Sequence, residues 1–218
     1  MAEPHAPGGT IALVGGGPFT DNDDLDRRLV AGRSGTVHVV PTADAYERPA
    51  EMVERAEAWG ERIGVRVEGV MAMVRPDARR DDLAAEVAGG DMVWLVGDSP
   101  IHLRTVMKDT PLWAAIVGVL GRGGLVVGVA GSAAALCDPM TDPRGGAFTF
   151  GLGLVPGMAV ITETETWAPE QLHRTHALAG DSVTADLPTG SALIRHAEAG
   201  GVRWELVGDA VVHGDLPL

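Results

Sequence analysis

The sequence has few of the features that mark membrane, secreted or nucleic-acid-binding proteins. Its 218 residues include a single cysteine, Cys137, so no internal disulfide can form, and a reducing compartment is expected. Its apolar runs are far shorter than the ~20 residues of a membrane-spanning helix. Basic residues number 17 against 30 acidic ones, which gives a net charge of −13. Because nucleic-acid phosphates require a basic surface, we expect no nucleic-acid partner and no membrane partner.

Targeting signals, repeats and low-complexity segments are also missing. Residues 1–10 contain neither a basic nor an apolar region, so we expect no signal peptide and a cytoplasmic protein. Aromatic residues make up only 4% of the chain, whereas apolar residues make up 45% and glycines number 30. This composition predicts a sizeable core with tight turns and close backbone packing. We predict a disordered tail over residues 1–9 and one α/β domain over residues 10–218.

Strand-like and helix-like segments alternate along the chain. The expected strands cover residues 10–14, 36–40, 65–73, 91–96, 158–162, 191–196 and 202–213, and the main expected helices cover residues 49–63, 81–88 and 169–179. A further strand and helix are expected within residues 123–136. This alternation predicts a three-layer, doubly wound, mostly parallel sheet with helices on both faces. In such a sheet the functional site lies beyond the carboxyl ends of the strands.

One stretch, residues 123–136, organises the rest of the chain. It reads Gly-Gly-Leu-Val-Val-Gly-Val-Ala-Gly-Ser-Ala-Ala-Ala-Leu. The β-branched run predicts a buried strand, the small residues a sharp turn, and the alanines a helix. Strand, turn and helix together form the shape of a nucleophile elbow, in which the turn presents one side chain in front of a helix N-terminus.

This stretch resembles the elbow of the cyanophycinase and dipeptidase E family of serine peptidases, whose pattern is Gly-x-Ser-Ala-Gly-Ala. The resemblance extends from about residue 10 to residue 213, and it implies a class I glutamine amidotransferase-like, flavodoxin-like fold. Aligned without gaps, the pattern places its first glycine on Gly128 and its nucleophilic serine on Ala130. The chain then lacks the nucleophile. A slip of two residues would instead place Ser132 in that role, and both registers stay open at this point.

A second departure from the family follows the segment Gly-Leu-Gly-Leu at residues 151–154. The family places its catalytic histidine after the next strand, within His-Phe, but this chain has Glu163-Thr164 there. The Arg-x-Arg that follows in cyanophycinases is also missing. A serine hydroxyl is nearly inert until a base takes its proton. Glu163 could act as a general base if burial raised its pKa.

The loop after the expected strand 91–96 is a candidate oxyanion site. It resembles the family's Gly-Gly-Asp/Asn-Gln segment, although the first glycine is Val96 here. The resemblance implies that the backbone of Gly97 and Asp98 binds the oxyanion. Asp98 or Ser99 would also cap the helix that begins at Pro100. We include Ser99 and Gly131, which follows the elbow residue, in this ligand-binding set.

Several other polar residues are secondary candidates. His102 lies in the first turn of the helix that follows this loop. The turn-rich segment 138–146 holds Asp138 and Asp142, either of which would orient a histidine in an active relative. His173 and His176 share one helix face and suit a metal ligand or a base. Their spacing alone is weak support for a metal, so we expect no metal and no cofactor.

Three functions therefore remain open. The first is a divergent peptidase-like protein that lacks the Ser-His pair and binds or transforms a small peptide-like or amino-acid-derived metabolite, with Glu163, Ser132 and the backbone at Gly97 and Asp98 as its working groups. The second is an active serine hydrolase that uses Ser132 with His173 or His176. The third is a non-catalytic interaction protein. The expected partner is a small molecule or short peptide, and a homodimer is one option for the assembly.

Overall fold

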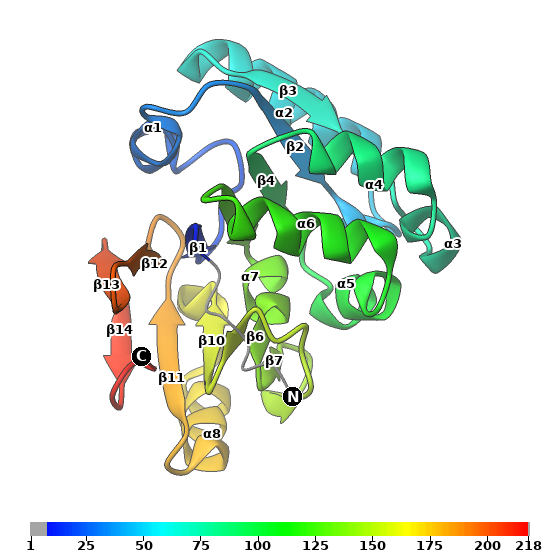
Figure 1. Cartoon of the computed structure of the whole chain (residues 1–218). Helices are drawn as coiled ribbons and strands as arrows, with labels where there is room; N and C mark the ends of the chain where they lie inside the picture. The colour runs from blue at the N-terminus through cyan, green and yellow to red at the C-terminus, as the bar shows by residue number, and fades with distance from the viewer. Residues whose placement is uncertain (1–7, 218) are drawn as a thin grey trace.

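A seven-stranded sheet runs through the centre of the computed structural model, which describes residues 8–217 (Figure 1). In spatial order its strands are β13 (Gly201–Val207), β12 (Ala192–Glu198), β1 (Thr10–Val14), β5 (Leu125–Val129), β4 (Met92–Leu95), β2 (Thr36–Val40) and β3 (Arg66–Gly69). The five strands from β1 to β3 pair in parallel, whereas β12 and β13 are antiparallel. The predicted α/β fold with a mostly parallel sheet is therefore confirmed.

Helices flank both faces of this sheet. Their bounds are α1 (Asp23–Val30), α2 (Pro49–Ile63), α3 (Arg75–Ala78), α4 (Asp81–Ala88), α5 (Pro100–Met107), α6 (Pro111–Gly121), α7 (Gly131–Leu136) and α8 (Pro169–Ala179), with short 3-10 turns η1 (Thr42–Asp44) and η2 (Thr164–Thr166). Alternate residues of β1 point to opposite faces, as the pleat requires. Val14 joins Trp59 of α2 in one core cluster, and Leu13 joins Ile116 of α6 in the other. The sheet is thus buried on both sides.

Local sequence signals explain where the helices begin and end. Proline occupies the first position of α2, α5, α6 and α8, where its missing N–H is not needed. Gly64 ends α2 with φ of 84°, and its N–H donates to the carbonyl of Gly60 at 2.8 Å. At the start of α6 the Thr110 hydroxyl accepts a hydrogen bond from the Trp113 N–H at 3.3 Å. The bounds of α2 and α8 coincide with the predicted ones because they are encoded locally.

A second, five-stranded sheet lies beside the first. Its order is β14 (Val211–His213), β11 (Val183–Leu187), β10 (Met158–Thr162), β6 (Cys137–Asp138) and β9 (Val155–Pro156), and β7 (Met140–Asp142) pairs separately with β8 (Ala147–Thr149). The sequence did not predict β11 as a strand, and it did not separate this sheet from the main one. β11 lies parallel to β10, so its strand state depends on a partner that the local pattern does not reveal.

Two predicted segments, residues 65–73 and the tail over residues 1–9, differ from the structure. The strand predicted over residues 65–73 is too long: β3 covers Arg66–Gly69, and the N–H groups of Met73 and Val74 bond to the Asp77 carboxylate at the start of α3. Of the predicted tail, residues 1–7 lie outside the described residues. Gly9 is buried, and its carbonyl accepts a hydrogen bond from the Ala197 N–H at 3.3 Å. Across residues 8–217, none of the helices has both the length and the apolar character needed to cross a bilayer.

Candidate functional site

The turn between β5 and α7 has an unusual backbone conformation. Ala130 has φ of 56° and ψ of −132°, a region that residues other than glycine rarely adopt. Its N–H donates to the carbonyl of Val14 at 3.0 Å, which fixes the turn against β1. The side chain of Ala130 is covered, because the residue is only 1% exposed.

Ser132 lies inside the protein, in the first turn of α7. It is 0% exposed. Its N–H donates to the carbonyl of Gly97 at 2.9 Å, and its hydroxyl lies 3.3 Å from the same oxygen. These bonds tie the start of α7 to the end of β4. Two cavities open at this end of the sheet, one beside Gly131 and one beside Asp44. Among residues 8–217, neither Ser132 nor any histidine lines either of them.

The loop after β4 packs tightly against the elbow. Gly97 has φ of 116°, and a Cβ atom there would come within 2.5 Å of an Asp44 carboxylate oxygen. The Asp98 N–H, one of the predicted oxyanion donors, donates to that carboxylate at 3.0 Å. A Cβ atom on Gly131 would come within 2.6 Å of the Asp98 carbonyl group. The backbone donor predicted for an oxyanion is thus occupied by a carboxylate from the same chain.

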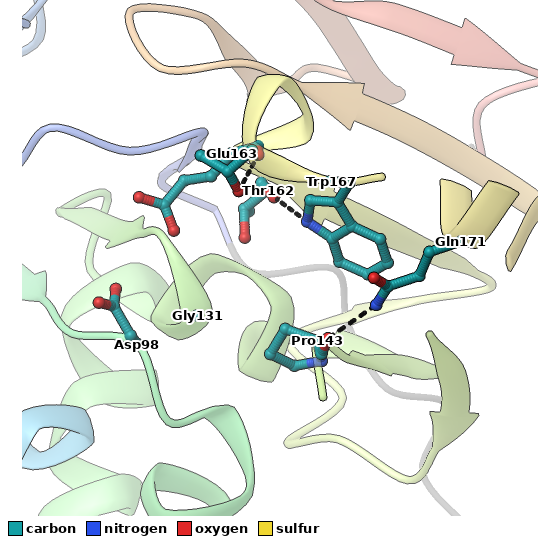
Figure 2. A pocket seen from close by; sticks show the side chains of 8 residues that line it. Asp98, Gly131, Pro143, Thr162, Glu163, Trp167 and Gln171 are labelled. Carbon is teal, nitrogen blue, oxygen red and sulfur yellow. Dashed lines mark hydrogen bonds between the residues drawn. The ribbon is translucent and has the colours of Figure 1, made fainter. Parts of the chain in front are cut away.

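A cavity of about 240 Å³ opens beside this turn (Figure 2). It is lined by Asp98, Gly131, Pro143, Thr162, Glu163, Thr166, Trp167 and Gln171. Figure 2 shows the carboxylates of Glu163 and Asp98 directed toward the same space beside Gly131. The structure therefore brings together three residues that the sequence singled out. Trp167 and Gln171, which the sequence analysis missed, form the far wall.

Hydrogen bonds hold that far wall in place. The Trp167 indole N–H donates to the carbonyl of Thr162 at 3.1 Å, and the Gln171 side-chain amide donates to the carbonyl of Pro143 at 3.1 Å. The second bond joins α8 to the loop between β7 and β8. An aromatic ring next to an amide is a common wall for a small-molecule pocket, but no pattern in the sequence marks these two residues in advance.

Glu163 follows β10 directly and adopts a left-handed conformation, with φ of 52° and ψ of 41°. Its N–H donates to the carbonyl of Leu187 at 2.8 Å, and its carbonyl accepts bonds from the N–H and the hydroxyl of Thr166, both at 2.8 Å. A Cβ atom on Gly16 would be 2.8 Å from the Glu163 Cγ. The glycine-rich turn after β1 therefore makes room for this side chain.

The pKa of Glu163 is raised to about 7. Burial is the main cause, followed by the negative charges of Asp98, Glu165 and Asp44. A carboxyl group with this pKa is present in both protonation states at neutral pH, so it can donate or accept a proton. The sequence analysis made that role conditional on burial, and the structure meets the condition.

A second cavity, of about 370 Å³, adjoins the first at Asp98 and Pro143. Its lining contributes Asp44, Glu47 and Asp142, together with Ser99 and Tyr46 among others. Burial is the first cause of the raised pKa values of Asp44 and Asp98, and the charge of Glu47 also raises both. In the described chain, Arg144 is the one basic residue that lines either cavity, and it is paired with Asp142 at 2.9 Å. The pair of cavities therefore carries a negative potential.

The sequence missed Asp44, although a signal was available. It lies four residues after β2, at the same edge of the sheet as the other candidates, and a carboxylate after a parallel strand is a typical site residue. The pairing of Asp44 with the Asp98 N–H could not be predicted, because it joins residues 54 positions apart.

The remaining candidates lie elsewhere. His102 bonds through Nε2 to the carbonyl of Met73 at 2.9 Å and packs on Tyr46. Asp138 accepts a hydrogen bond from the Gly151 N–H at 3.1 Å. His173 is exposed on α8, and His176 turns toward Asp186. Neither histidine lines either cavity.

No protein-family model matches this chain, and no curated protein matches it. Several solved structures are similar to it, and two of them are named as peptidases. The crystal structure of a peptidase from an acI-B1 Actinobacterium has a TM-score of 0.83 and 22% identity, covering 96% of this chain and 92% of that one. A putative Peptidase E protein from Listeria monocytogenes EGD-e has a TM-score of 0.68 and 16% identity, covering 92% and 99%. At such low identities the likeness shows a peptidase E-like fold and nothing finer.

Proposed function

We propose that this protein is a divergent peptidase E-like protein that lacks the Ser-His pair and binds or transforms a small peptide-like or amino-acid-derived ligand by chemistry other than that of a serine peptidase. The observation that carries the proposal is the backbone of Ala130, whose φ of 56° and ψ of −132° lie at the junction of β5 and α7. A strained turn between a buried strand and a helix supports the interpretation of this segment as a nucleophile elbow. An alanine there has no group that could attack a carbonyl carbon.

The position after β10 supports the same proposal. Glu163 stands where the resemblance expects the histidine, and its carboxylate is directed into the cavity (Figure 2). With a pKa of about 7, it would serve as a proton donor or acceptor for a bound ligand. The Asp44 carboxylate on the Asp98 N–H would further weaken binding of an oxyanion, because it occupies the donor and adds negative charge.

The charge of the two cavities indicates the chemistry of the ligand. Asp44, Glu47, Asp98 and Glu163 supply carboxylates, and the one lining cation in the described chain, Arg144, is paired. A ligand with a free ammonium group would relieve the mutual repulsion of these carboxylates. The α-amino group of an amino acid or short peptide has this charge. Burial of Ser132 gives no support to the alternative of a Ser132 hydrolase.

Binding of matched dipeptides tests the ligand class. We expect dipeptides with a free amino terminus to bind, and their N-acetylated counterparts to bind at least roughly tenfold more weakly, since one unpaired carboxylate contact corresponds to about that factor. Asp98→Asn should weaken binding of the free peptides. Asp209→Asn, an equal charge change on an exposed turn, is the matched control. Isothermal titration calorimetry of the wild-type protein and the two variants with both kinds of peptide measures all six combinations.

A covalent serine probe tests the chemistry. The wild-type protein should not react with a fluorophosphonate. Labelling that disappears in Ser132→Ala would support the hydrolase and contradict the proposal. If neither the free nor the acetylated peptides bind at millimolar concentration and no metabolite co-purifies, an interaction protein becomes the better explanation.

A further inference from the structure

A cluster of two histidines and one aspartate lies outside the candidate site. His176 is on α8, Asp186 on β11 and His213 on β14. The Nε2 atoms of both histidines lie 3.1 Å from the same oxygen, Oδ2 of Asp186. The two imidazole rings have centroids 4.5 Å apart. None of these residues lines either cavity beside the elbow, so the cluster is a separate feature.

The fold brings these residues together from distant parts of the chain. β14 pairs antiparallel with β11, with His213 opposite Thr184 and Val211 opposite Asp186. Because Thr184 and Asp186 are two residues apart on one strand, their side chains share a face, and His213 is a diagonal neighbour of Asp186. α8 packs against β11 and adds His176. Figure 1 shows β14 beside β11 and α8 at the end of that sheet.

The spacing of the three side chains fits one metal ion. A tetrahedral ion with ligands at about 2.0–2.1 Å holds neighbouring ligand atoms about 3.4 Å apart. The two nitrogen-to-oxygen distances here are 3.1 Å, and one ligand atom from each of the three residues lies within 4.8 Å of the other two. Small rotations of the side chains would suffice to admit an ion. In the described part of the chain, Asp186 Oδ1 is buried and has no hydrogen-bond partner, which leaves a second carboxylate oxygen to ligate or support the ion.

The composition of the cluster favours a particular class of metal. Imidazole nitrogen suits Zn²⁺ and its first-row neighbours, whereas Mg²⁺ and Ca²⁺ prefer oxygen ligands only. The side chains of Asp186 and His176 are 15% and 26% exposed, and that of His213 is 47% exposed. One side of the cluster therefore faces water, which would complete the coordination. Two imidazoles and one carboxylate with an open fourth position form a recognised zinc arrangement.

The geometry points to a site for one divalent transition-metal ion, Zn²⁺ by preference, held by His176 Nε2, Asp186 and His213 Nε2. The ion joins β14 and α8 to β11. It therefore stabilises this end of the molecule, since a ligand that binds only the folded chain raises its stability. The expectation of no metal rested on His173 with His176, which are neighbours in sequence. The histidine that lies beside His176 in the folded protein is His213, from β14.

Metal titration of the full-length, chelator-treated protein tests this assignment. We expect one Zn²⁺ per chain by calorimetry at pH 7.5, a higher Tm with Zn²⁺ than without, and no comparable effect of Mg²⁺. Co²⁺ should give the intense visible absorption of a four-coordinate centre. Binding should weaken at least tenfold at pH 5.5, because an imidazole nitrogen must be free of its proton to bind a metal ion.

Variants separate the site from adventitious binding. His213→Ala and His176→Ala should each lower the Zn²⁺ affinity at least tenfold. His173→Ala, which removes an exposed histidine from the same helix, should not. Asp186→Asn is a second test that retains the side-chain shape, and circular dichroism of the metal-free variants checks that they fold. Zn²⁺ binding that is absent at 100 µM, or that His213→Ala leaves unchanged, would show that the cluster is only a hydrogen-bonded network.

Discussion

At residue 130 the backbone has a conformation that residues other than glycine rarely adopt. Positive φ at a non-glycine residue costs on the order of 1–3 kcal/mol and persists only when the surroundings enforce it. Here the enforcement is visible: the Ala130 N–H bonds to Val14, and the following turn is tied to Gly97 through Ser132. The conformation of this turn is therefore held by packing and hydrogen bonds, and it does not depend on a serine at residue 130.

If the proposed function is right, a serine introduced at residue 130 without a histidine should give little hydrolysis. Ala130→Ser alone supplies a hydroxyl but no imidazole, and a general base contributes about 10²–10⁴-fold to such reactions. We expect Ala130→Ser with Glu163→His to hydrolyse aminoacyl p-nitroanilides at least roughly 10²-fold faster than Ala130→Ser alone. Initial rates and fluorophosphonate labelling measure the difference.

Two results would count against this placement of the residues. Brisk hydrolysis by Ala130→Ser alone would show that another base already faces residue 130. Loss of the double variant's activity on adding Ser132→Ala would show that Ser132 takes part. The second change removes a hydroxyl that is bonded inside the protein, so its folded state must be checked by circular dichroism.

Single residues of the site were predictable where the signal lay in short, local patterns. The spacing of glycines around the elbow located Ala130, and counting from the segment at residues 151–154 located Glu163. The raised pKa of Glu163 and the occupation of the Asp98 N–H by Asp44 depend on contacts between distant segments. Such contacts follow from the packing of whole elements, which a local pattern does not describe.

The close approach of α7 to the loop before α5 shapes the site at the scale of elements. A Cβ atom at Gly131 would lie 2.6 Å from the Asp98 backbone, which has little freedom to move. The resembled family pattern has alanine at this position. Glycine here lets the loop settle against the helix start, and this contact brings the Asp98 carboxylate to the cavity edge.

Gly131→Ala should therefore destabilise the protein by about 2 kcal/mol, as overpacking of a tight contact does. Gly121→Ala is the matched control: Gly121 ends α6, and a Cβ atom there meets nothing within 4 Å. That change should stabilise the protein by about 0.5–1 kcal/mol, because it restricts the unfolded chain. Urea unfolding measures both. Equal effects of the two changes would contradict the proposed contact.

Helices and strands could be predicted from the sequence where short local patterns set their bounds. The helix at Pro49–Ile63 has a proline start, a glycine end and a clear apolar face, and it matches the prediction in full. β6 and β9 contain two residues each, and only their pairing makes them strands. β11 contains Asp186 in the middle of its apolar residues, which hides the strand pattern. The same carboxylate belongs to the proposed metal site.

At the scale of the whole molecule, the acidic composition and the fold together predict an unusual dependence of stability on pH. Burial raises the pKa of Asp26 and of Glu163 to about 7 in the folded protein. Asp26 is a buried residue of α1 and accepts a hydrogen bond from the indole N–H of Trp59, on α2, at 3.0 Å. Partners with positive charge lower the pKa of Asp23 and Asp142, chiefly through hydrogen bonds from Arg62 and Arg144.

A carboxyl group makes the stability of the protein depend on pH when the folded and unfolded states bind its proton with different affinity. A carboxyl group with a raised folded pKa favours folding most at low pH, and this contribution disappears as pH rises from about 4 to 7. A carboxyl group with a lowered folded pKa stabilises the folded protein at pH values above its unfolded pKa. This stabilisation is lost as the pH falls below about 4. The negative net charge of the chain also lowers stability as the pH rises, because the repulsion between carboxyl groups grows as they ionise. The free energy of unfolding should therefore be greatest near pH 5.

We expect the free energy of unfolding to fall by roughly 2–4 kcal/mol between pH 5 and pH 8, with Asp26 as the largest contributor and Glu163 smaller because water screens it. Asp26→Asn keeps an acceptor for the Trp59 N–H and removes the buried charge. It should raise the unfolding free energy at pH 8 and leave it nearly unchanged near pH 4. Urea unfolding of both proteins across this pH range measures the difference. Stability that rises from pH 5 to pH 8, or an equal effect of Asp26→Asn at both ends, would show that these carboxyl groups ionise freely in the folded protein.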